Sequence, residues 1–242
     1  FGPRFCDAAR TYRGFSPKIS LQKEFATGEL IYALVTEGYR PGGFNSSGFF
    51  PIRASRTTFA PDRLRNYEIG AKFRRFDRRL GVRASAYYND WSNIQTDRYR
   101  TSGLAYTANV GDARIYGLEA EATYDWPFGL SLQLNGLLSD SETKNPNPDF
   151  DAPVTRSLPG VPKVSGGMVA IYERPLTGNL TLRLLGEASY VGHSALSFDA
   201  TLPSRMGHYI RARVSAEVAT DTWRLTAYVS NPFNDAGDTF AY

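Results

Sequence analysis

The chain has few of the residues from which catalytic and metal centres are usually built. Its 242 residues include one cysteine, Cys6, so no disulfide can form within it and no Cys/His zinc spacing exists. GxSxG, P-loop, HExxH and Rossmann signatures are also absent from the sequence. We therefore expect no enzyme, no catalytic residue, no resident metal and no cofactor.

Long hydrophobic runs and blocks of one charge are missing too. No stretch approaches 18 consecutive apolar residues, a length that a transmembrane helix would need. The net charge of +4 comes from 28 basic residues scattered among 24 acidic ones, which argues against a nucleic-acid partner. What the chain does have is 42% apolar residues, with fifteen Tyr and fifteen Phe. This composition excludes a mainly disordered protein and favours a β-rich one with interfacial rings.

Apolar residues recur at every second position in most of the chain, whereas a helical period is almost absent. From Leu80 to Tyr88, for example, apolar side chains alternate with Gly81, Arg83, Ser85 and Tyr87. Such alternation is typical of strands with one apolar and one polar face. The pattern predicts about ten strands, near residues 17–25, 29–39, 62–75, 79–99, 104–124, 128–141, 161–173, 179–192, 207–219 and 222–231.

The connections between these strands alternate in length. Short turns are predicted at residues 27–28, 77–78, 127–129, 176–179 and 221, and long polar loops at 40–61, 142–160 and 193–206. This order describes an up-and-down antiparallel meander. A soluble β-sandwich remains possible, but strands this long suit a transmembrane β-barrel, whose strands need about 9–11 residues.

The two strand faces have separate expected roles. Rings beside the short turns predict an aromatic girdle at the periplasmic side, unless they cap a soluble core; they are Phe25, Phe73, Phe76, Trp126, Phe128, Tyr172 and Trp223. Charged residues of both signs are predicted to face the lumen: Glu68, Lys72, Arg74, Arg83, Glu119, Glu121, Arg183, Glu187, Arg211, Arg213, Glu217 and Arg224. Such a wall suits either a water-filled pore or a barrel that holds a folded plug.

Four stretches in order resemble the C-terminal barrel half of TonB-dependent outer-membrane receptors. They are FSPKISLQ with LIYALVTEGYRPGGFN (residues 15–45), FAPDRLRNYEIGAKFRRFDRRLGVRASAYYNDWSNIQ (59–95), NVGDARIYGLEAEATY (109–124) and YVSNPFNDAGDTFAY (228–242). Asp62 departs slightly from the pattern, where Glu is more usual. The resemblance implies an all-β transmembrane barrel of 22 strands, of which residues 1–242 supply about ten, with the plug domain and terminal strand outside this sequence.

The resemblance also implies a function and its partners. The expected function is import of a scarce nutrient, foremost a ferric siderophore, across the outer membrane of a Gram-negative bacterium. Haem, cobalamin, nickel complexes and oligosaccharides stay open as substrates. TonB would act through the missing N-terminal region, and the expected partners are the plug, outer-membrane lipid and an iron chelate. A passive porin-like or structural barrel is the alternative, and a soluble β-rich binding module is a weaker one.

The resemblance implies ligand contacts in the extracellular loops, where rings and arginines would suit catecholates, sugars and anionic chelates. They are Arg40, Phe44, Phe49, Phe50, Arg53, Tyr99, Arg100 and Tyr106. The alternative, favoured for any single one of these residues, is that they pack the loops against each other. His193 and His208 flank one loop and, without a metal signature, are expected to be solvated residues. In EGYRPGGFN (37–45), Pro41 is expected to end strand pairing, and Gly42 and Gly43 to supply positive φ angles for the turn.

Overall fold

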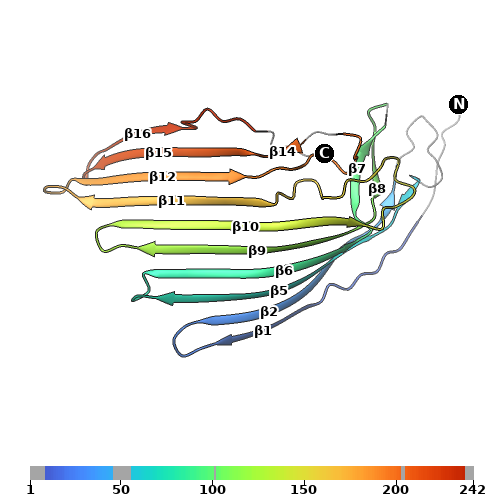
Figure 1. Ribbon diagram of the computed structural model, residues 1–242, viewed down its shortest axis with the longest axis horizontal. Coiled ribbons are helices and arrows are strands. Elements are labelled where there is room, and N and C mark those ends of the chain that lie inside the picture. Colours follow the sequence, from blue (N-terminus) through green and yellow to red (C-terminus); the bar gives the residue numbers. More distant parts are fainter. Residues whose placement is uncertain (1–8, 46–55, 101, 203–204, 238–242) are drawn as a thin grey trace.

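The fold is built around one large antiparallel sheet. The computed structural model describes residues 9–45, 56–100, 102–202 and 205–237. Ten strands form the sheet: β1 (Lys18–Glu24), β2 (Leu30–Arg40), β5 (Asp62–Arg75), β6 (Leu80–Ser92), β9 (Asp112–Asp125), β10 (Leu130–Lys144), β11 (Val164–Pro175), β12 (Thr181–Val191), β15 (Tyr209–Ala219) and β16 (Arg224–Ser230). Each strand pairs with its neighbour in chain order, which confirms the meander (Figure 1).

The two ends of the sheet differ in their connections. Five tight turns join the hairpins at one end, on the left of Figure 1. Glycines with positive φ shape three of these turns: Gly28 at 85°, Gly129 at 95° and Gly178 at 63°. The long connections gather at the other end and carry three small hairpins: β3 (Gly43–Phe44) with β4 (Thr58–Phe59), β7 (Gln95–Tyr99) with β8 (Ala105–Asn109), and β13 (Ser194–Ala195) with β14 (Arg205–Met206).

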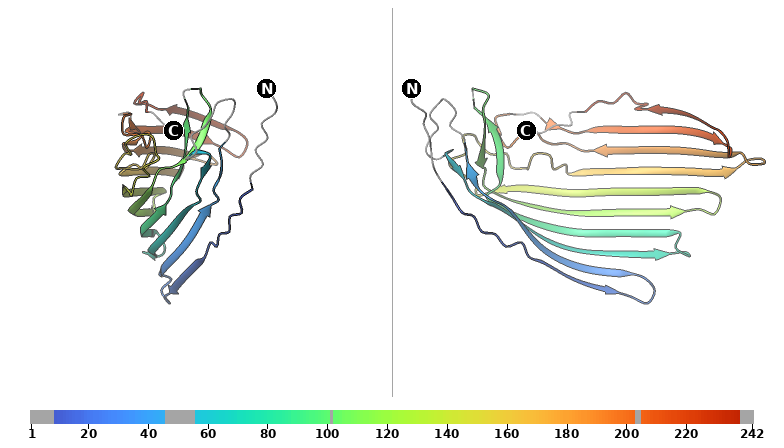
Figure 2. Two further views of the ribbon diagram at one scale, coloured as in Figure 1. Left: turned by 90° about the vertical axis from the view of Figure 1, so that its right-hand side faces the viewer. Right: turned by 180° about the vertical axis from the view of Figure 1, so that it is seen from behind.

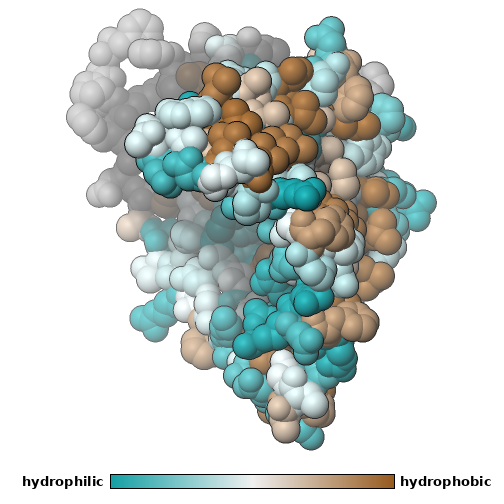
Figure 3. All heavy atoms as spheres, turned by 90° about the vertical axis from the view of Figure 1, so that its left-hand side faces the viewer, coloured by the Kyte–Doolittle hydropathy of each residue, from teal (hydrophilic) through white to brown (hydrophobic). Residues whose placement is uncertain are grey.

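The sheet curves strongly, and its faces differ in chemistry (Figure 2). Because directly paired residues share a face, the register separates an outward face from a lumen face. The outward face carries exposed apolar side chains, including Ile31, Ile69, Leu118 and Val214, which are 47%, 63%, 56% and 49% exposed. Seen from the short-turn end, apolar residues gather along the outer side of the curved wall (Figure 3).

The buried core lies at the loop end and not along the sheet. Ile94, Ala113 and Leu158 are 0–2% exposed and pack together, with Trp91, Ile115, Val161 and Phe198 around them. No helix of the described residues is both long and apolar enough to span a membrane. The apolar side chains of the outward face, by contrast, stay exposed in this chain.

Two long predicted strands are interrupted. The predicted strand 79–99 is divided at Asn93, whose φ is 53°, and the predicted strand 104–124 is divided at Gly111, whose φ is 137°. The loop-end parts of both predicted strands instead form the β7–β8 hairpin. At its base the Ile94 amide donates to the Gly111 carbonyl oxygen and the Val110 amide donates to the Ile94 carbonyl oxygen, both at 2.8 Å. Positive φ cannot continue a strand, so these residues end the wall.

The predicted role of Gly42 and Gly43 is wrong, because neither residue has a positive φ. Gly43 lies in β3, and a Cβ on it would stand 2.6 Å from the Phe59 ring. A Cβ on Gly42 would stand 2.4 Å from the Phe59 carbonyl oxygen. The glycines are therefore needed for the close approach of two chain segments.

Candidate functional site

The predicted lumen residues form a single charged wall. The register of β5, β6, β9, β10, β11, β12, β15 and β16 runs without a bulge, so residue parity decides the face. All twelve residues share the face opposite Leu118: Glu68, Lys72, Arg74, Arg83, Glu119, Glu121, Arg183, Glu187, Arg211, Arg213, Glu217 and Arg224. Whether they contact a plug stays a prediction.

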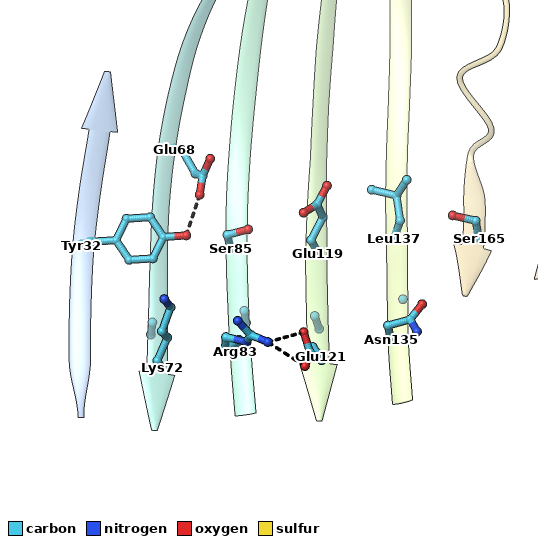
Figure 4. A pocket seen from close by; sticks show the side chains of 14 residues that line it. Tyr32, Glu68, Lys72, Arg83, Ser85, Glu119, Glu121, Asn135, Leu137 and Ser165 are labelled. Atoms are coloured by element: carbon cyan, nitrogen blue, oxygen red, sulfur yellow. Dashed lines mark hydrogen bonds and ion pairs between the residues drawn. The ribbon is translucent and has the colours of Figure 1, made fainter. Parts of the chain in front are cut away.

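The part of this wall between β2 and β11 contains two side-chain pairs. The Tyr32 hydroxyl donates to Glu68 Oε1 at 2.5 Å, and Arg83 Nη2 lies 2.8 Å from both carboxylate oxygens of Glu121 (Figure 4). These groups line a groove of about 440 Å³. Lys72 is the register partner of Arg83, so two cations and one carboxylate stand in line across three strands. This section therefore presents charges of both signs on the lumen face.

The part between β12 and β16 holds its arginines differently. Arg224 Nε lies 3.3 Å from Glu217 Oε1, whereas Arg211 stacks over Tyr209 and Arg213 over Tyr228, at 5.4 and 5.0 Å from the ring centroids. Arg211 and Arg213 line a groove of about 720 Å³ together with Glu187. Within the described part of the chain neither arginine forms an ion pair. Each guanidinium is thus held over an aromatic ring, and its charge remains accessible to an anionic group.

Asp62 organises the point where three strands reach the loop end. It is 2% exposed and accepts hydrogen bonds from Arg40 Nε at 3.0 and 2.9 Å, Trp91 Nε1 at 3.1 Å and the Gln95 amide at 3.4 Å. Gln95 Nε2 in turn donates to the carbonyl oxygens of Pro41 and Ala60 at 3.0 and 2.9 Å. The guanidinium of Arg40, a predicted ligand contact, is therefore engaged in this network although its side chain is 53% exposed.

The other predicted ligand contacts fall into two groups. Tyr106 is 7% exposed and lies under the guanidinium groups of Arg56 and Arg100, 5.4 and 5.8 Å from its ring centroid, so it packs one loop against another. Phe44 and Tyr99 are 47% and 61% exposed at the loop end. Phe49, Phe50 and Arg53 lie outside the described residues, as does Cys6. The ligand-binding role of all eight residues stays a prediction.

Side chains tie the loops to one another. The Asn45 side chain pairs with the Thr107 backbone in the way that a neighbouring strand would. Its Nδ2 donates to the Thr107 carbonyl oxygen at 2.7 Å, and its Oδ1 accepts from the Thr107 amide at 2.8 Å. Asn147 Nδ2 donates to the Asn109 carbonyl at 2.8 Å. These contacts are not predictable from the sequence, since Asn is common in any loop. The tertiary structure makes the loops into one connected layer.

Among these contacts between loops, that of Arg98 with Asp199 joins the residues farthest apart in the sequence. Arg98 Nη2 lies 3.0 Å from Asp199 Oδ2, and the guanidinium stacks 4.5 Å from the Phe150 ring centroid. Burial acts to raise the pKa of Asp199, but hydrogen bonds from Thr201 and the Arg98 charge outweigh it, so this pKa lies below its ordinary value. Asp199 is consequently an anion that holds two distant loops together.

The two histidines meet at the base of the loop that they flank. The His193 and His208 rings stack with centroids 4.3 Å apart, and Tyr190 Oη lies 3.3 Å from His208 Nδ1. Among the residues that the structure describes, no group of three or more His, Cys, Asp or Glu side chains could hold a metal ion.

The sequence matches the family described as TonB dependent receptor-like, beta-barrel over residues 2–231. The chain belongs to this family. It is 26% identical to the pesticin receptor of Yersinia pestis over 221 residues, which cover 88% of this chain and 30% of that protein. The resemblance inferred from the sequence and the all-β transmembrane barrel architecture are thereby confirmed.

Solved structures of TonB-dependent receptors share this fold. The ferric yersiniabactin uptake receptor of Yersinia pestis superposes with a TM-score of 0.69 at 25% identity, covering 89% of this chain and 32% of that one. The ferric preacinetobactin receptor of Acinetobacter baumannii gives a TM-score of 0.67 at 19% identity, covering 92% and 32%. The chain thus spans about a third of the length of these relatives.

Proposed function

We propose that this chain is part of the barrel of an outer-membrane receptor of a Gram-negative bacterium, which imports a ferric siderophore with energy supplied through TonB. The observation that carries the proposal is the family match over residues 2–231, on a sheet whose faces are apolar outside and charged inside. Two similar structures are named as receptors for ferric siderophores, which supports the choice of substrate.

In this proposal the chain supplies about ten strands of a larger barrel of about 22 strands, and further strands complete it beyond β1 and β16. An open edge would leave unpaired backbone groups in hydrocarbon, so both edges require partners. A plug would lie against the lumen wall, where Glu68, Arg83 and Glu121 offer paired charges and Arg211 and Arg213 offer unpaired ones. TonB would act on the plug from the periplasm.

The loop layer would form part of the entrance for the ligand. Its ties through Asp62, Asn45 and Arg98 hold the loop bases in fixed positions, and Phe44 and Tyr99 are exposed on it. Exposed rings suit stacking on a catecholate or another aromatic chelator. We expect Phe44 and Tyr99, more than the engaged Arg40 and the buried Tyr106, to contact the ligand.

Uptake by the complete receptor tests this function. A strain that lacks the gene should lose growth on at least one ferric siderophore given as the only iron source, and the gene on a plasmid should restore it. Uptake of radiolabelled iron from that siderophore should also stop in a strain without TonB. TonB-independent uptake would instead indicate a passive pore, and normal growth on every ferric chelate would contradict the substrate.

A further inference from the structure

The turn between β5 and β6 is built differently from the other four short turns. Three consecutive residues in it have positive φ angles: Phe76 at 53°, Asp77 at 53° and Arg78 at 71°. The Arg79 amide closes the turn by donating to the Phe76 carbonyl oxygen at 3.0 Å. Among the other four turns, which all lie within the described residues, glycine takes the positive φ in three, and the β15–β16 turn has none. Of these five turns, only the β5–β6 turn places side chains in this conformation.

Arg78 stands where such a turn favours glycine. A two-residue hairpin turn with positive φ at both central positions prefers Asn or Asp followed by Gly. Asp77 fits the first position, but at the second an L residue is strained, because its Cβ crowds the following carbonyl oxygen. Glycine would remove this strain. Strain that persists at one exposed turn indicates that the Arg78 side chain has a role other than folding.

The same turn concentrates positive charge. Arg74 and Arg75 end β5, and Arg78 and Arg79 follow after two residues, so residues 74–79 read RRFDRR. The connecting residues of the other four short turns contain no Arg or Lys; they are 25–29, 126–129, 176–180 and 220–223. The positive charge is therefore a property of this turn and not of short turns in general.

One of the four arginines already has a carboxylate partner. Arg75 lies on the outward face, where it forms an ion pair with Glu29 and stacks over the Phe73 ring, 6.0 Å from its centroid. Lipid headgroups beside the outward face would thus meet a cation that is already neutralised.

The other three arginines lie at the tip and on the lumen side of the turn. In the part of the chain that the structure describes, no carboxylate forms an ion pair with Arg74, Arg78 or Arg79, and all three are exposed. The register places Arg74 on the lumen face. The Asp125 amide donates to the Arg79 carbonyl oxygen at 3.0 Å, which extends the β6–β9 ladder by one residue and places Arg79 on the same face. Arg78 occupies the tip.

We propose that Arg74, Arg78 and Arg79 form a docking surface for an acidic segment of a separate periplasmic protein. The proposal rests on the orientation given above, in which the short turns lie in the periplasm. Each guanidinium can hold a carboxylate through two parallel hydrogen bonds, so three of them on adjacent sides of one turn suit successive carboxylates of an extended chain. A carrier for the imported chelate that docked here would stand beside the opening through which the chelate leaves.

The positions of these arginines favour a separate protein over other occupants. Anionic lipid would lie beside the outward side, where Arg75 is already paired. A segment held inside the lumen would reach Arg74 and Arg79 but not the tip, where the strained Arg78 lies. A protein that approaches from the periplasm meets Arg78 first.

Binding of an acidic peptide to the complete receptor tests the inference. The receptor is placed in nanodiscs of phosphatidylcholine at about 0.15 M salt, where charges more than about 8 Å apart are largely screened. Fluorescence anisotropy then compares a labelled peptide of about ten glutamates with a Gly/Ser peptide of the same length. We expect only the glutamate peptide to bind. The triple variant Arg74→Gln, Arg78→Gln, Arg79→Gln should weaken this binding by about tenfold or more.

Single substitutions locate the surface within the turn. Arg78→Gln should weaken binding by about threefold, whereas Arg75→Gln removes the same charge from the paired arginine and should change it by less than about twofold. Arg78→Gly should weaken binding as much as Arg78→Gln does, yet raise the denaturant concentration at which the receptor unfolds, because it relieves the strain. Unchanged binding in Arg78→Gly would show that the arginine has no docking role.

Other outcomes would also overturn the inference. Failure of the glutamate peptide to bind, or equal losses from Arg75→Gln and Arg78→Gln, would exclude the docking surface. Peptide binding that phosphatidylglycerol in the nanodiscs weakens would assign the arginines to lipid. Binding that appears only after removal of the receptor segment ahead of the plug would assign them to that segment. These measurements use neither iron nor TonB, so their failure is distinct from failure of the uptake test.

Discussion

The strand wall and the loop layer are stabilised in opposite ways. In the wall, large apolar side chains such as Ile69 and Leu118 are 63% and 56% exposed, and the charged pairs of the lumen face are exposed too. In the loop layer, Ile94 and Leu158 are 0% and 2% exposed, and Asp62 is a buried carboxylate. The described part of the wall leaves both of its faces exposed, whereas the loop layer has a buried core of its own.

A charge in the middle of the wall should have the largest effect. Ala120 lies midway between Tyr116 and Tyr124 on the outward face, so we expect Ala120→Arg to destabilise the barrel in a bilayer by about 3 kcal/mol. Denaturant titration of the complete receptor in lipid measures this effect. Glu119→Gln on the lumen face is the control and should cost far less. Equal losses from both variants would contradict the assignment of faces.

A cavity in the loop layer should have a slightly smaller and more local effect. Leu158 is 2% exposed against Ile94 and Ala113, so Leu158→Ala should cost about 2 to 3 kcal/mol. Hydrogen exchange should accelerate in residues 145–163 and 93–111 and stay unchanged in the middle of β9 and β10. Acceleration across the whole wall would show that the two regions unfold together.

Loss of the Asp62 carboxylate charge should loosen the bases of the first two loops. Asp62→Asn keeps the shape but weakens the bonds from Arg40 and Trp91, and we expect a cost of about 1 to 2 kcal/mol. Proteolysis within residues 41–61 should accelerate in parallel. Asp112→Asn, at the other end of the β7–β8 hairpin, provides a comparison, and protection of residues 41–61 in the Asp62 variant would contradict the proposed network.

The tie between Arg98 and Asp199 should respond to acid. The pKa of Asp199 is depressed in the folded protein, so its stabilising contribution is complete above the ordinary value of 3.8 and is lost as the pH falls through the lower folded pKa. The hydrogen-exchange protection factors near residues 98 and 199, which correct for the intrinsic effect of pH on exchange, should therefore be steady around pH 5 and fall only below pH 3.8. In Asp199→Asn the protection factors at pH 5 should be lower, and they should not fall further below pH 3.8.

The smallest effect should come from an exposed pair on the lumen face. Arg83 and Glu121 are 58% and 42% exposed, so their mutual stabilisation in this chain should be about 0.5 kcal/mol or less. A double-mutant cycle with Arg83→Ala and Glu121→Ala measures it. A coupling above about 1 kcal/mol would show that a plug shields the pair from water.

The sequence predicted the ten strands, the five short turns and the sorting of twelve charged residues to one face. These features follow from the local alternation of apolar and polar residues and from turn-forming residues, which act over a few positions of the chain. The adjacent positions of Tyr67, Tyr88 and Tyr116 on the outward face were not predictable, because these residues become neighbours only when the register of three strands is known. The rings near the short turns were easier to find, since each lies close to a turn.

The candidate site was predictable only in outline. The sequence indicated which loops are long and which residues in them could contact a ligand, but it could not indicate that Arg40 holds Asp62 or that Tyr106 is buried under Arg56 and Arg100. It also assigned Gly42 and Gly43 to a turn, where the structure uses them for contact with Phe59. Apart from the contact of Arg100 with Tyr106, these contacts join residues that are 16 to 50 positions apart, and no local pattern encodes them.

The alternation of apolar and polar residues was enough to specify antiparallel strands with one apolar and one charged face, because a period of two has a single structural meaning at this length. The ends of the wall, the contacts between the loops and the pairing of the charges became known from the three-dimensional arrangement of the chain. Alternation is a property of each strand alone, whereas Asp62 and Arg98 acquire their partners from other parts of the chain.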